Sequence, residues 1–265
     1  MRRFYDLSLE ERLQQVGAES GLAAEELAAL GGSAGLSPAQ ADHMIENVVG
    51  IYSLPLGIAR NFVVNGREVL VPMVLEEPSV VAGASFMAKL AKAGGGFTAS
   101  ADEPHMIGQM QIVELPDPAA ARLRLLAEKD ALLAEVARVD PVLARLGGGP
   151  VDLEVRLIEE SPVGPFLVLH LIYDVRDAMG ANAINTATER LTPSVQKISG
   201  GRVHLRILSN LADRRLARAA CTIPLPQLAF NEFSAEQVRD GVIAAWAFAA
   251  ADPYRAATHN KGIMN

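Results

Sequence analysis

Cysteine is nearly absent from this chain, which has one, Cys221, among 265 residues. A single cysteine excludes an internal disulfide bond and any zinc site built from several thiolates, and it is typical of a reducing compartment such as the cytoplasm. We expect Cys221 to be a small buried apolar residue rather than a catalytic thiol. The five histidines form no His-x-x-x-His pair, so the sequence predicts no metal site.

An excess of basic residues is also absent. The chain has 24 Lys and Arg against 31 Asp and Glu, which gives a net charge of −7 and a pI near 5.3. Nucleic acid and anionic membrane surfaces are bound through basic patches that release counterions. We therefore exclude both as main partners, although a small anion can still bind locally.

Long hydrophobic runs are missing as well. The most apolar run, Gly241–Ala251, lies between two aspartates and is far shorter than the roughly 20 residues that span a bilayer. The first six residues, Met1–Asp6, lack the apolar core of a secretory signal. The sequence therefore predicts a cytoplasmic protein without a membrane segment.

What is present is a folded core, since half of the residues are hydrophobic. Residues 8–50 carry helix-start signals, and Asn65-Gly66 between two β-type runs predicts a hairpin. A helix is predicted over residues 79–93, so Glu76 and Glu77 lie at a strand-to-helix junction. Adjacent side chains of extended chain point to opposite sides, and a surface acidic pair is the simplest interpretation.

The middle of the chain predicts a strand–helix–strand–strand–helix–strand order. Polar and apolar residues alternate around 106–112, 151–157 and 203–207, whereas 166–175 is almost wholly apolar. Two helical patterns separate these strands, one after Asp117-Pro118 and one from about Asn182. This order is the ferredoxin-like unit. We predict an α+β protein in which residues 104–209 are a domain inserted into a large, helix-rich domain of residues 1–103 and 210–265.

A turn of small residues precedes the second helix of the insert, and it consists of Asp177, Ala178, Met179, Gly180, Ala181 and Asn182. Backbone N–H groups and the positive end of the helix dipole can approach a pyrophosphate there. The alternative is a tight turn in which Asn182 is an ordinary N-cap. The segment lacks the GxGxxG pattern, so a Rossmann site is not implied.

Two other polar positions have both a structural and a functional interpretation. Asp140 precedes Pro141 and either caps a short helix or accepts hydrogen bonds from an adenosine ribose, which would favour NAD over NADP. Residues 252–261 gather ionisable and amide groups after the apolar run, and we expect them to form a solvated loop.

Taken together, four segments resemble the hydroxymethylglutaryl-CoA (HMG-CoA) reductases, specifically the bacterial class II branch. They are Glu46–Gly50 with Leu54–Ala59, Val71–Ser79, Asp177–Asn182 and Asp252–Asn265. The likeness extends through essentially the whole chain, and its class II character rests on the Glu76-Glu77-Pro78-Ser79 run.

The resemblance implies a large domain that binds HMG-CoA, a small inserted domain that binds NAD, and an active site completed across a homodimer or higher homo-oligomer. It implies that Glu77 is the catalytic glutamate and Lys261 the lysine that polarises the mevaldyl carbonyl. Segment Asp177–Asn182 would bind the dinucleotide, and Asp140 would favour NAD. The implied substrate contacts are Ser79, Arg255, Asn210 and Asn265.

The implied reaction converts mevalonate, coenzyme A and two NAD⁺ into HMG-CoA and two NADH, in the degradative direction. Members of the family continue far beyond the Lys261–Asn265 segment, and their catalytic aspartate and mobile histidine lie there. We therefore expect this chain to be a truncated form or part of a longer protein, incomplete for turnover. The alternatives are a catalytically silent binder of dinucleotide or acyl-CoA, and a general interaction module.

Overall fold

The computed structural model describes residues 2–32 and 35–264, and it divides into two compact units. The first unit combines Met1–Thr98 with Ala220–Asn265, and the second is Ala99–Ala219. Strands β3 (Phe97–Ala101) and β8 (Ala217–Cys221) carry the chain from one unit to the other and are neighbours in one sheet. The boundaries of the second unit therefore fall within these two strands. The unit is a few residues longer at each end than the insert of residues 104–209 that the sequence predicts.

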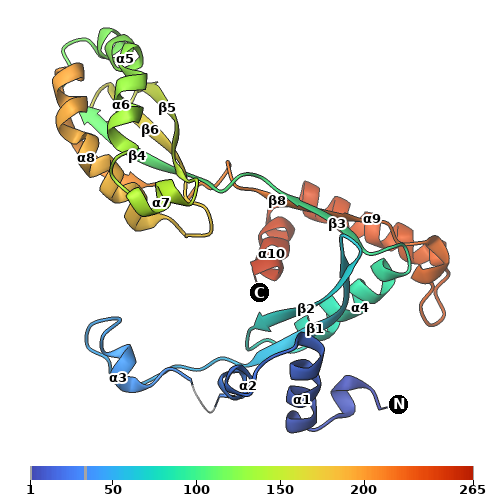
Figure 1. Ribbon diagram of the computed structural model, residues 1–265. Helices are drawn as coiled ribbons and strands as arrows, with labels where there is room; N and C mark the ends of the chain where they lie inside the picture. Colours follow the sequence, from blue (N-terminus) through green and yellow to red (C-terminus); the bar gives the residue numbers. More distant parts are fainter. Residues whose placement is uncertain (1, 33–34, 265) are drawn as a thin grey trace. The chain divides into compact units, whose positions relative to one another are not determined.

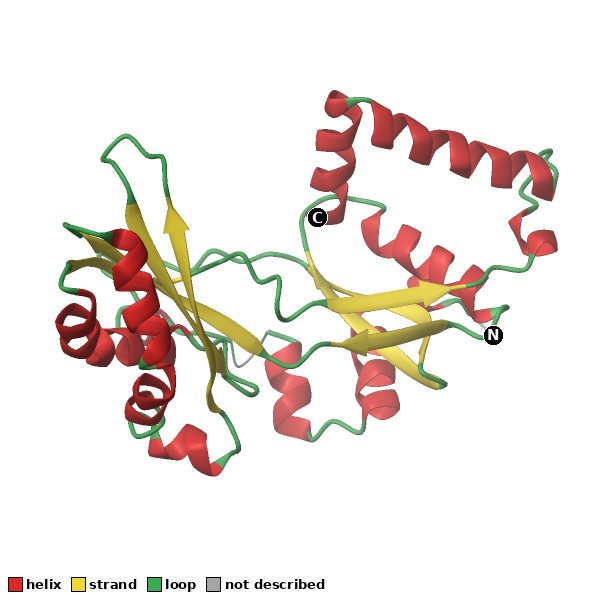
Figure 2. Ribbon diagram, turned by 90° about the horizontal axis from the view of Figure 1, so that it is seen from above, coloured by secondary structure: helices red, strands yellow, loops and turns green. Residues whose placement is uncertain are grey.

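The second unit is an antiparallel four-stranded sheet covered by helices, and its order confirms the predicted α+β, ferredoxin-like fold. The strands lie in the order β5-β6-β4-β7, so the two central strands are the first and third of the unit. Figures 1 and 2 show the helices gathered on one face of this sheet. Its elements are β4 (His105–Val113), α5 (Pro118–Ala127), α6 (Lys129–Val136), α7 (Pro141–Arg145), β5 (Gly149–Ile158), β6 (Phe166–Asp174), α8 (Ala181–Ser199) and β7 (Arg202–Leu208).

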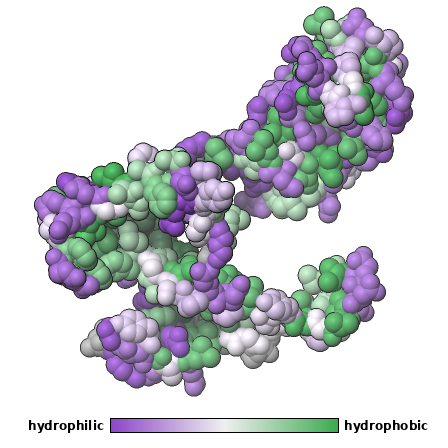
Figure 3. Space-filling view, turned by 180° about the vertical axis from the view of Figure 1, so that it is seen from behind, coloured by the Kyte–Doolittle hydropathy of each residue, from purple (hydrophilic) through white to green (hydrophobic). Residues whose placement is uncertain are grey.

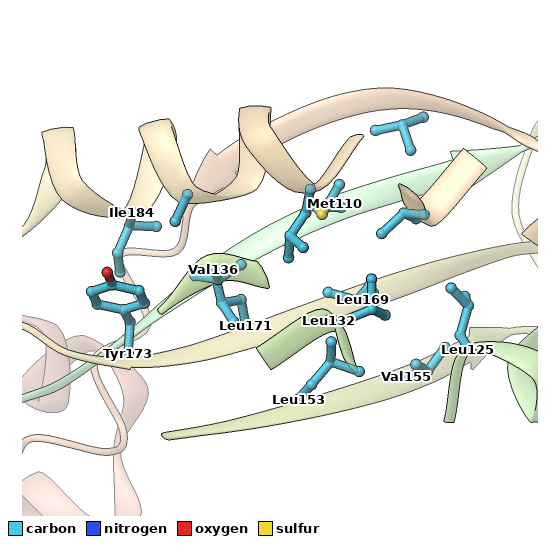
Figure 4. Close-up of a cluster of buried hydrophobic side chains, with 14 of the residues drawn as sticks. Met110, Leu125, Leu132, Val136, Leu153, Val155, Leu169, Leu171, Tyr173 and Ile184 are labelled. Atoms are coloured by element: carbon cyan, nitrogen blue, oxygen red, sulfur yellow. The ribbon is translucent and has the colours of Figure 1, made fainter. Parts of the chain in front are cut away.

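The core of the second unit lies between that sheet face and helices α5, α6 and α8 (Figure 4). Met110, Leu169 and Leu171 from the central strands are wholly enclosed, as are Leu125 and Ile184 from the helices. Burying one such side chain contributes about 1.5–3 kcal/mol, so this face carries most of the unit's stability. One detail differs from the prediction: the helix after Asp117 is interrupted at residue 128 and forms two helices, α5 and α6.

Three helices begin with the same Asp-Pro pair. Asp117 caps α5 through the Ala120 N–H (2.9 Å), and Asp140 caps α7. Asp252 likewise accepts a hydrogen bond from the Arg255 N–H (2.7 Å) at the start of α10 (Pro253–Met264). The prediction of a solvated loop over residues 252–261 was therefore wrong, because a carboxylate cap followed by proline at the first helical position starts a helix here too.

The first unit is built on the sheet β2-β1-β3-β8. The predicted hairpin is confirmed, and Asn65 and Gly66 have φ values of 50° and 79°, as a tight turn between antiparallel strands requires. Helix α4 packs against β1. The elements are α1 (Leu9–Ser20), α2 (Ala24–Leu30), α3 (Pro38–Ala41), β1 (Leu56–Val64), β2 (Arg67–Val74), α4 (Val80–Lys92), β3, β8, α9 (Ala235–Ala251) and α10, with short 3₁₀ turns at Phe4–Asp6 and Leu225–Leu228.

Hydrophobic side chains remain exposed on the first unit, and Figure 3 shows them as green areas of its surface. Helix α9 has no buried residue, and its Trp246 is 68% exposed. Cys221 in β8 is also exposed, so the expectation of a buried thiol was wrong. Within residues 2–32 and 35–264, no helix is long and apolar enough to cross a membrane.

Candidate active site

A lysine and a glutamate that lie 184 positions apart in the chain meet on the first unit. Glu77 lies in the turn between β2 and α4, and Lys261 lies on α10. The Lys261 Nζ donates a hydrogen bond to Glu77 Oε2 at 2.5 Å. The two side chains are 64% and 49% exposed, so substrate can reach both. At this distance a carboxyl group and an ammonium can act on the same substrate oxygen, one by exchanging a proton and the other by stabilising negative charge.

Ser79 follows Glu77 by two residues and has an unusual backbone. Its φ of 71° places a non-glycine residue in the left-handed region at the start of α4, and its side chain makes no capping hydrogen bond. Such strain is uncommon and tends to concentrate at functional sites.

An open cavity of about 970 Å³ adjoins Ser79. Five cationic side chains line it: Arg2, Arg3, Arg12, Arg60 and Lys89. Among the described residues, no carboxylate is part of the lining, but three of the cations pair with carboxylates outside it: Arg60 with Glu19 (2.8 Å), Arg3 with Asp6 (2.9 Å) and Arg2 with Glu11. Arg12 and Lys89 form no such pair within the described residues, so the lining still favours an anion. The sequence did not reveal this cavity, because its cations come from three separate segments with no common spacing.

The other proposed substrate contacts are dispersed. Arg255 lies in the first turn of α10, two turns before Lys261, and is partly buried. Asn210 is exposed just after β7 and belongs to the second unit. Asn265 lies outside the described residues. The structure thus brings Glu77 and Lys261 together and puts Ser79 and Arg255 on their unit, whereas Asn210 lies on the other one.

The turn of small residues lies between β6 and α8 in the second unit. Gly180 is the N-cap of α8, with φ 96°, so the prediction that Asn182 caps this helix was wrong. Gly180 is buried, and a Cβ atom there would lie 2.5 Å from Cγ1 of Val175. No side chain caps the helix, and its first internal hydrogen bond is Ile184 N–H to Gly180 O at 3.0 Å. The N–H groups of residues 181–183 therefore point out of the helix start, as a bound phosphate requires.

An ion pair fixes the beginning of this turn. Asp174 is 5% exposed, accepts a hydrogen bond from the Arg176 N–H (2.9 Å) and pairs with the Arg176 guanidinium. Arg176 itself has a left-handed φ of 52°. The ion pair holds the backbone of Arg176 in a conformation that a non-glycine residue does not otherwise favour. Nothing in the sequence pattern indicated this ion pair.

Asp140 caps α7, as one of its two interpretations predicted. Its Oδ1 accepts hydrogen bonds from the Val142 N–H (3.1 Å) and the Leu143 N–H (2.9 Å). Burial, and then the negative charge of Asp140, raises the pKa of Tyr173 at the end of β6. The cap and a ligand contact are compatible, because both amides use the same carboxylate oxygen. In the described part of the chain, no group of three His, Cys, Asp or Glu side chains is placed to hold a metal ion.

Known proteins share this arrangement of segments. The sequence profile of hydroxymethylglutaryl-coenzyme A reductases matches residues 8–265. The chain is 50% identical over 262 residues to the 3-hydroxy-3-methylglutaryl-coenzyme A reductase of Archaeoglobus fulgidus. This alignment covers 99% of this chain and 58% of that protein. It is 28% identical over 233 residues to a probable reductase of the same name from Borreliella burgdorferi, covering 84% of this chain and 50% of that one.

Solved structures give the same result. The class II 3-hydroxy-3-methylglutaryl-CoA reductase of Streptococcus pneumoniae, in a structure bound to NADPH in open conformations, matches with a TM-score of 0.92 and 40% identity. The match covers 98% of this chain and 70% of that one. The chain thus spans 58% and 50% of the two curated relatives described above.

Proposed function

The chain belongs to the hydroxymethylglutaryl-coenzyme A reductase family, and from this premise we propose that it interconverts HMG-CoA with mevalonate and coenzyme A. In the direction we propose, mevalonate, coenzyme A and two NAD⁺ give HMG-CoA, two NADH and two protons. The observation that carries the proposal is the 2.5 Å contact between Lys261 and Glu77, two residues that only the fold brings together.

The roles of the two side chains follow from the charge that the reaction moves. Nicotinamide dinucleotide would supply the redox chemistry when bound, each of two molecules in turn carrying one hydride. Each transfer changes the negative charge on one substrate oxygen, and the Lys261 ammonium stabilises that charge. Glu77 exchanges the proton of the same oxygen. Ser79 and Arg255 bind the acyl portion, and we also assign substrate contacts to Asn210 and Asn265.

The cationic cavity beside Ser79 supports an acyl-CoA substrate, because coenzyme A carries several phosphate charges. Arg12 and Lys89 line it without a carboxylate partner among the described residues, and such cations bind phosphate oxygens. The exposed apolar side chains of α9 support the proposal of a homodimer or higher homo-oligomer, with the active site at the subunit interface.

We also propose a cytoplasmic location, for which the single exposed Cys221 is the support.

The dinucleotide fits the turn at Asp177–Asn182. Gly180 provides a cradle that a Cβ atom would fill, and the uncapped start of α8 directs N–H groups toward the space beyond it. We propose NAD rather than NADP as the cofactor, because the Asp140 carboxylate would repel a 2′-phosphate and accept a hydrogen bond from a ribose hydroxyl. The Streptococcus pneumoniae relative is bound to NADPH in its structure, so this choice needs its own test.

We expect Asp140→Asn to lower the ratio of NAD to NADP affinity about tenfold, the equivalent of roughly 1.4 kcal/mol. The amide keeps the oxygen that caps α7 but removes the charge that opposes the 2′-phosphate. The matched control is Asp117→Asn, which makes the same change at the cap of α5. An unchanged affinity ratio in the Asp140 variant would leave that residue as a helix cap alone.

Two measurements test the function. The 265-residue chain is titrated with NADH and with HMG-CoA by calorimetry, and a protein extended to the length of the Archaeoglobus fulgidus relative is assayed for NADH formation that requires both mevalonate and coenzyme A. Binding together with turnover supports the reductase. Binding without turnover in the extended protein supports a silent binder, and binding of neither ligand supports an interaction module.

A further inference from the structure

Tyr173 is a buried tyrosine whose hydroxyl has no protein partner. Tyr173 lies at the end of β6 and is 1% exposed, and Figure 4 shows its ring beside Ile184 of α8. No described residue forms a hydrogen bond with its hydroxyl. Buried polar groups are nearly always hydrogen-bonded in native proteins, to the protein, to water or to a ligand. The hydroxyl therefore needs a partner from outside the chain.

The hydroxyl is also reachable from solvent. Among the described residues, the fully enclosed side-chain nitrogen and oxygen atoms without a hydrogen-bond partner belong to Arg60, Arg176 and Arg206. The Tyr173 hydroxyl also lacks a partner but is not among these enclosed atoms. Its oxygen is therefore not fully enclosed, and the small exposed part of the side chain is at that oxygen. The ring is fixed in the core while its polar end meets solvent, as expected for a ligand-binding tyrosine.

Two features of the dinucleotide site converge on this end of the core. Val175, two residues after Tyr173, packs against Gly180 at the start of α8. Helix α7, which Asp140 caps, lies against the same end of β6, because a Cβ atom added at Gly148 would lie 2.7 Å from Asp174 O and 2.8 Å from Leu143 Cγ. The negative charge of Asp140 also contributes to the raised pKa of Tyr173. Both capping hydrogen bonds of Asp140 go to Oδ1, so its Oδ2 has no hydrogen-bond partner within the described residues. A phenol donor and a carboxylate acceptor thus remain available at this end of the core.

We infer that Tyr173 and Asp140 together bind the adenosine ribose of the dinucleotide. The Asp140 Oδ2 accepts the proton of one ribose hydroxyl, and the Tyr173 hydroxyl donates its proton to the oxygen of the other. A vicinal diol offers both groups on one rigid ring, and the uncapped start of α8 holds the adjoining pyrophosphate. This inference rests on the proposed function and adds Tyr173 to its cofactor-binding residues.

The experiment compares Tyr173→Phe with the unchanged chain of 265 residues. We expect the dissociation constants of NADH and of ADP-ribose to rise about three- to tenfold, as for the loss of one hydrogen bond. The melting temperature should stay the same or rise, because the substitution removes an unpaired hydroxyl from a packed site. Nicotinamide mononucleotide, which lacks the adenosine ribose, should bind both proteins equally.

The control is Thr188→Val, which removes another buried hydroxyl of the same core. That hydroxyl donates to Ile184 O (3.1 Å), so this variant should lose stability and keep its affinity for NADH. Equal NADH affinity in the Tyr173→Phe variant and the parent overturns the inference, as does an equal loss in both variants or a loss with NADH but not with ADP-ribose. If the parent chain binds no dinucleotide, the proposed function itself fails.

Discussion

Replacing Lys261 by alanine should lower mevalonate-dependent NADH formation about 100- to 1000-fold in a protein extended to the length of its Archaeoglobus fulgidus relative. The Lys261 Nζ lies 2.5 Å from Glu77 Oε2. In the reaction we propose, the substrate oxygen gains and loses negative charge beside this pair. Loss of the ammonium removes a charge that acts most strongly when that oxygen is charged, so the turnover number should fall more than the affinity for mevalonate. Initial rates at several mevalonate concentrations separate the two effects.

The matched control for this prediction is Lys92→Ala. Lys92 also lies on the first unit and pairs with a glutamate, Glu68, and both of those side chains are exposed. Exposed ion pairs contribute little to stability, so neither substitution should change the melting temperature appreciably. A Lys261→Ala protein as fast as the Lys92→Ala protein would remove Lys261 from the reaction.

The sequence predicted the second unit well because its signals are local. Alternating polar and apolar residues mark the strands that bury mainly one face, the almost wholly apolar run marks the central strand β6, and the helices bury one stripe each. The buried pattern of α8, with Ile184, Leu191 and Val195 enclosed, matches the spacing that predicted it. Asn65-Gly66 likewise specifies its own turn geometry without help from the rest of the chain.

The parts that the residue pattern alone could not predict depend on contacts between distant positions. The proximity of Lys261 and Glu77 was implied only by the family resemblance, since no spacing rule connects residues 184 positions apart. Tyr173 looked like one more apolar position of a buried strand, because its free hydroxyl is apparent only once Asp140 and α8 lie beside it. Cys221 was expected inside the protein because of its residue type, but its strand has no buried residue.

Gly180→Ala should weaken NADH binding more than tenfold. Gly180 has φ 96°, a backbone conformation that residues with a Cβ atom rarely adopt, and the added Cβ would lie 2.5 Å from Val175 Cγ1 and 2.9 Å from its Cβ. Relief of this overlap must move the backbone at the start of α8, and a strained residue costs about 1–3 kcal/mol. The N–H groups of residues 181–183 would then no longer converge on the pyrophosphate. Fluorescence titration with NADH measures the loss.

The control for Gly180→Ala is Gly200→Ala, at the other end of the same helix. Gly200 also has a left-handed φ, 73°, but the nearest atom to an added Cβ lies 4.0 Å away, so this variant has the backbone strain without the overlap. Both variants should unfold at lower temperature, whereas only Gly180→Ala should lose affinity for NADH. Parallel losses of affinity would attribute the effect to destabilised α8 rather than to the phosphate-binding turn, and retained affinity in Gly180→Ala would move the dinucleotide away from this turn.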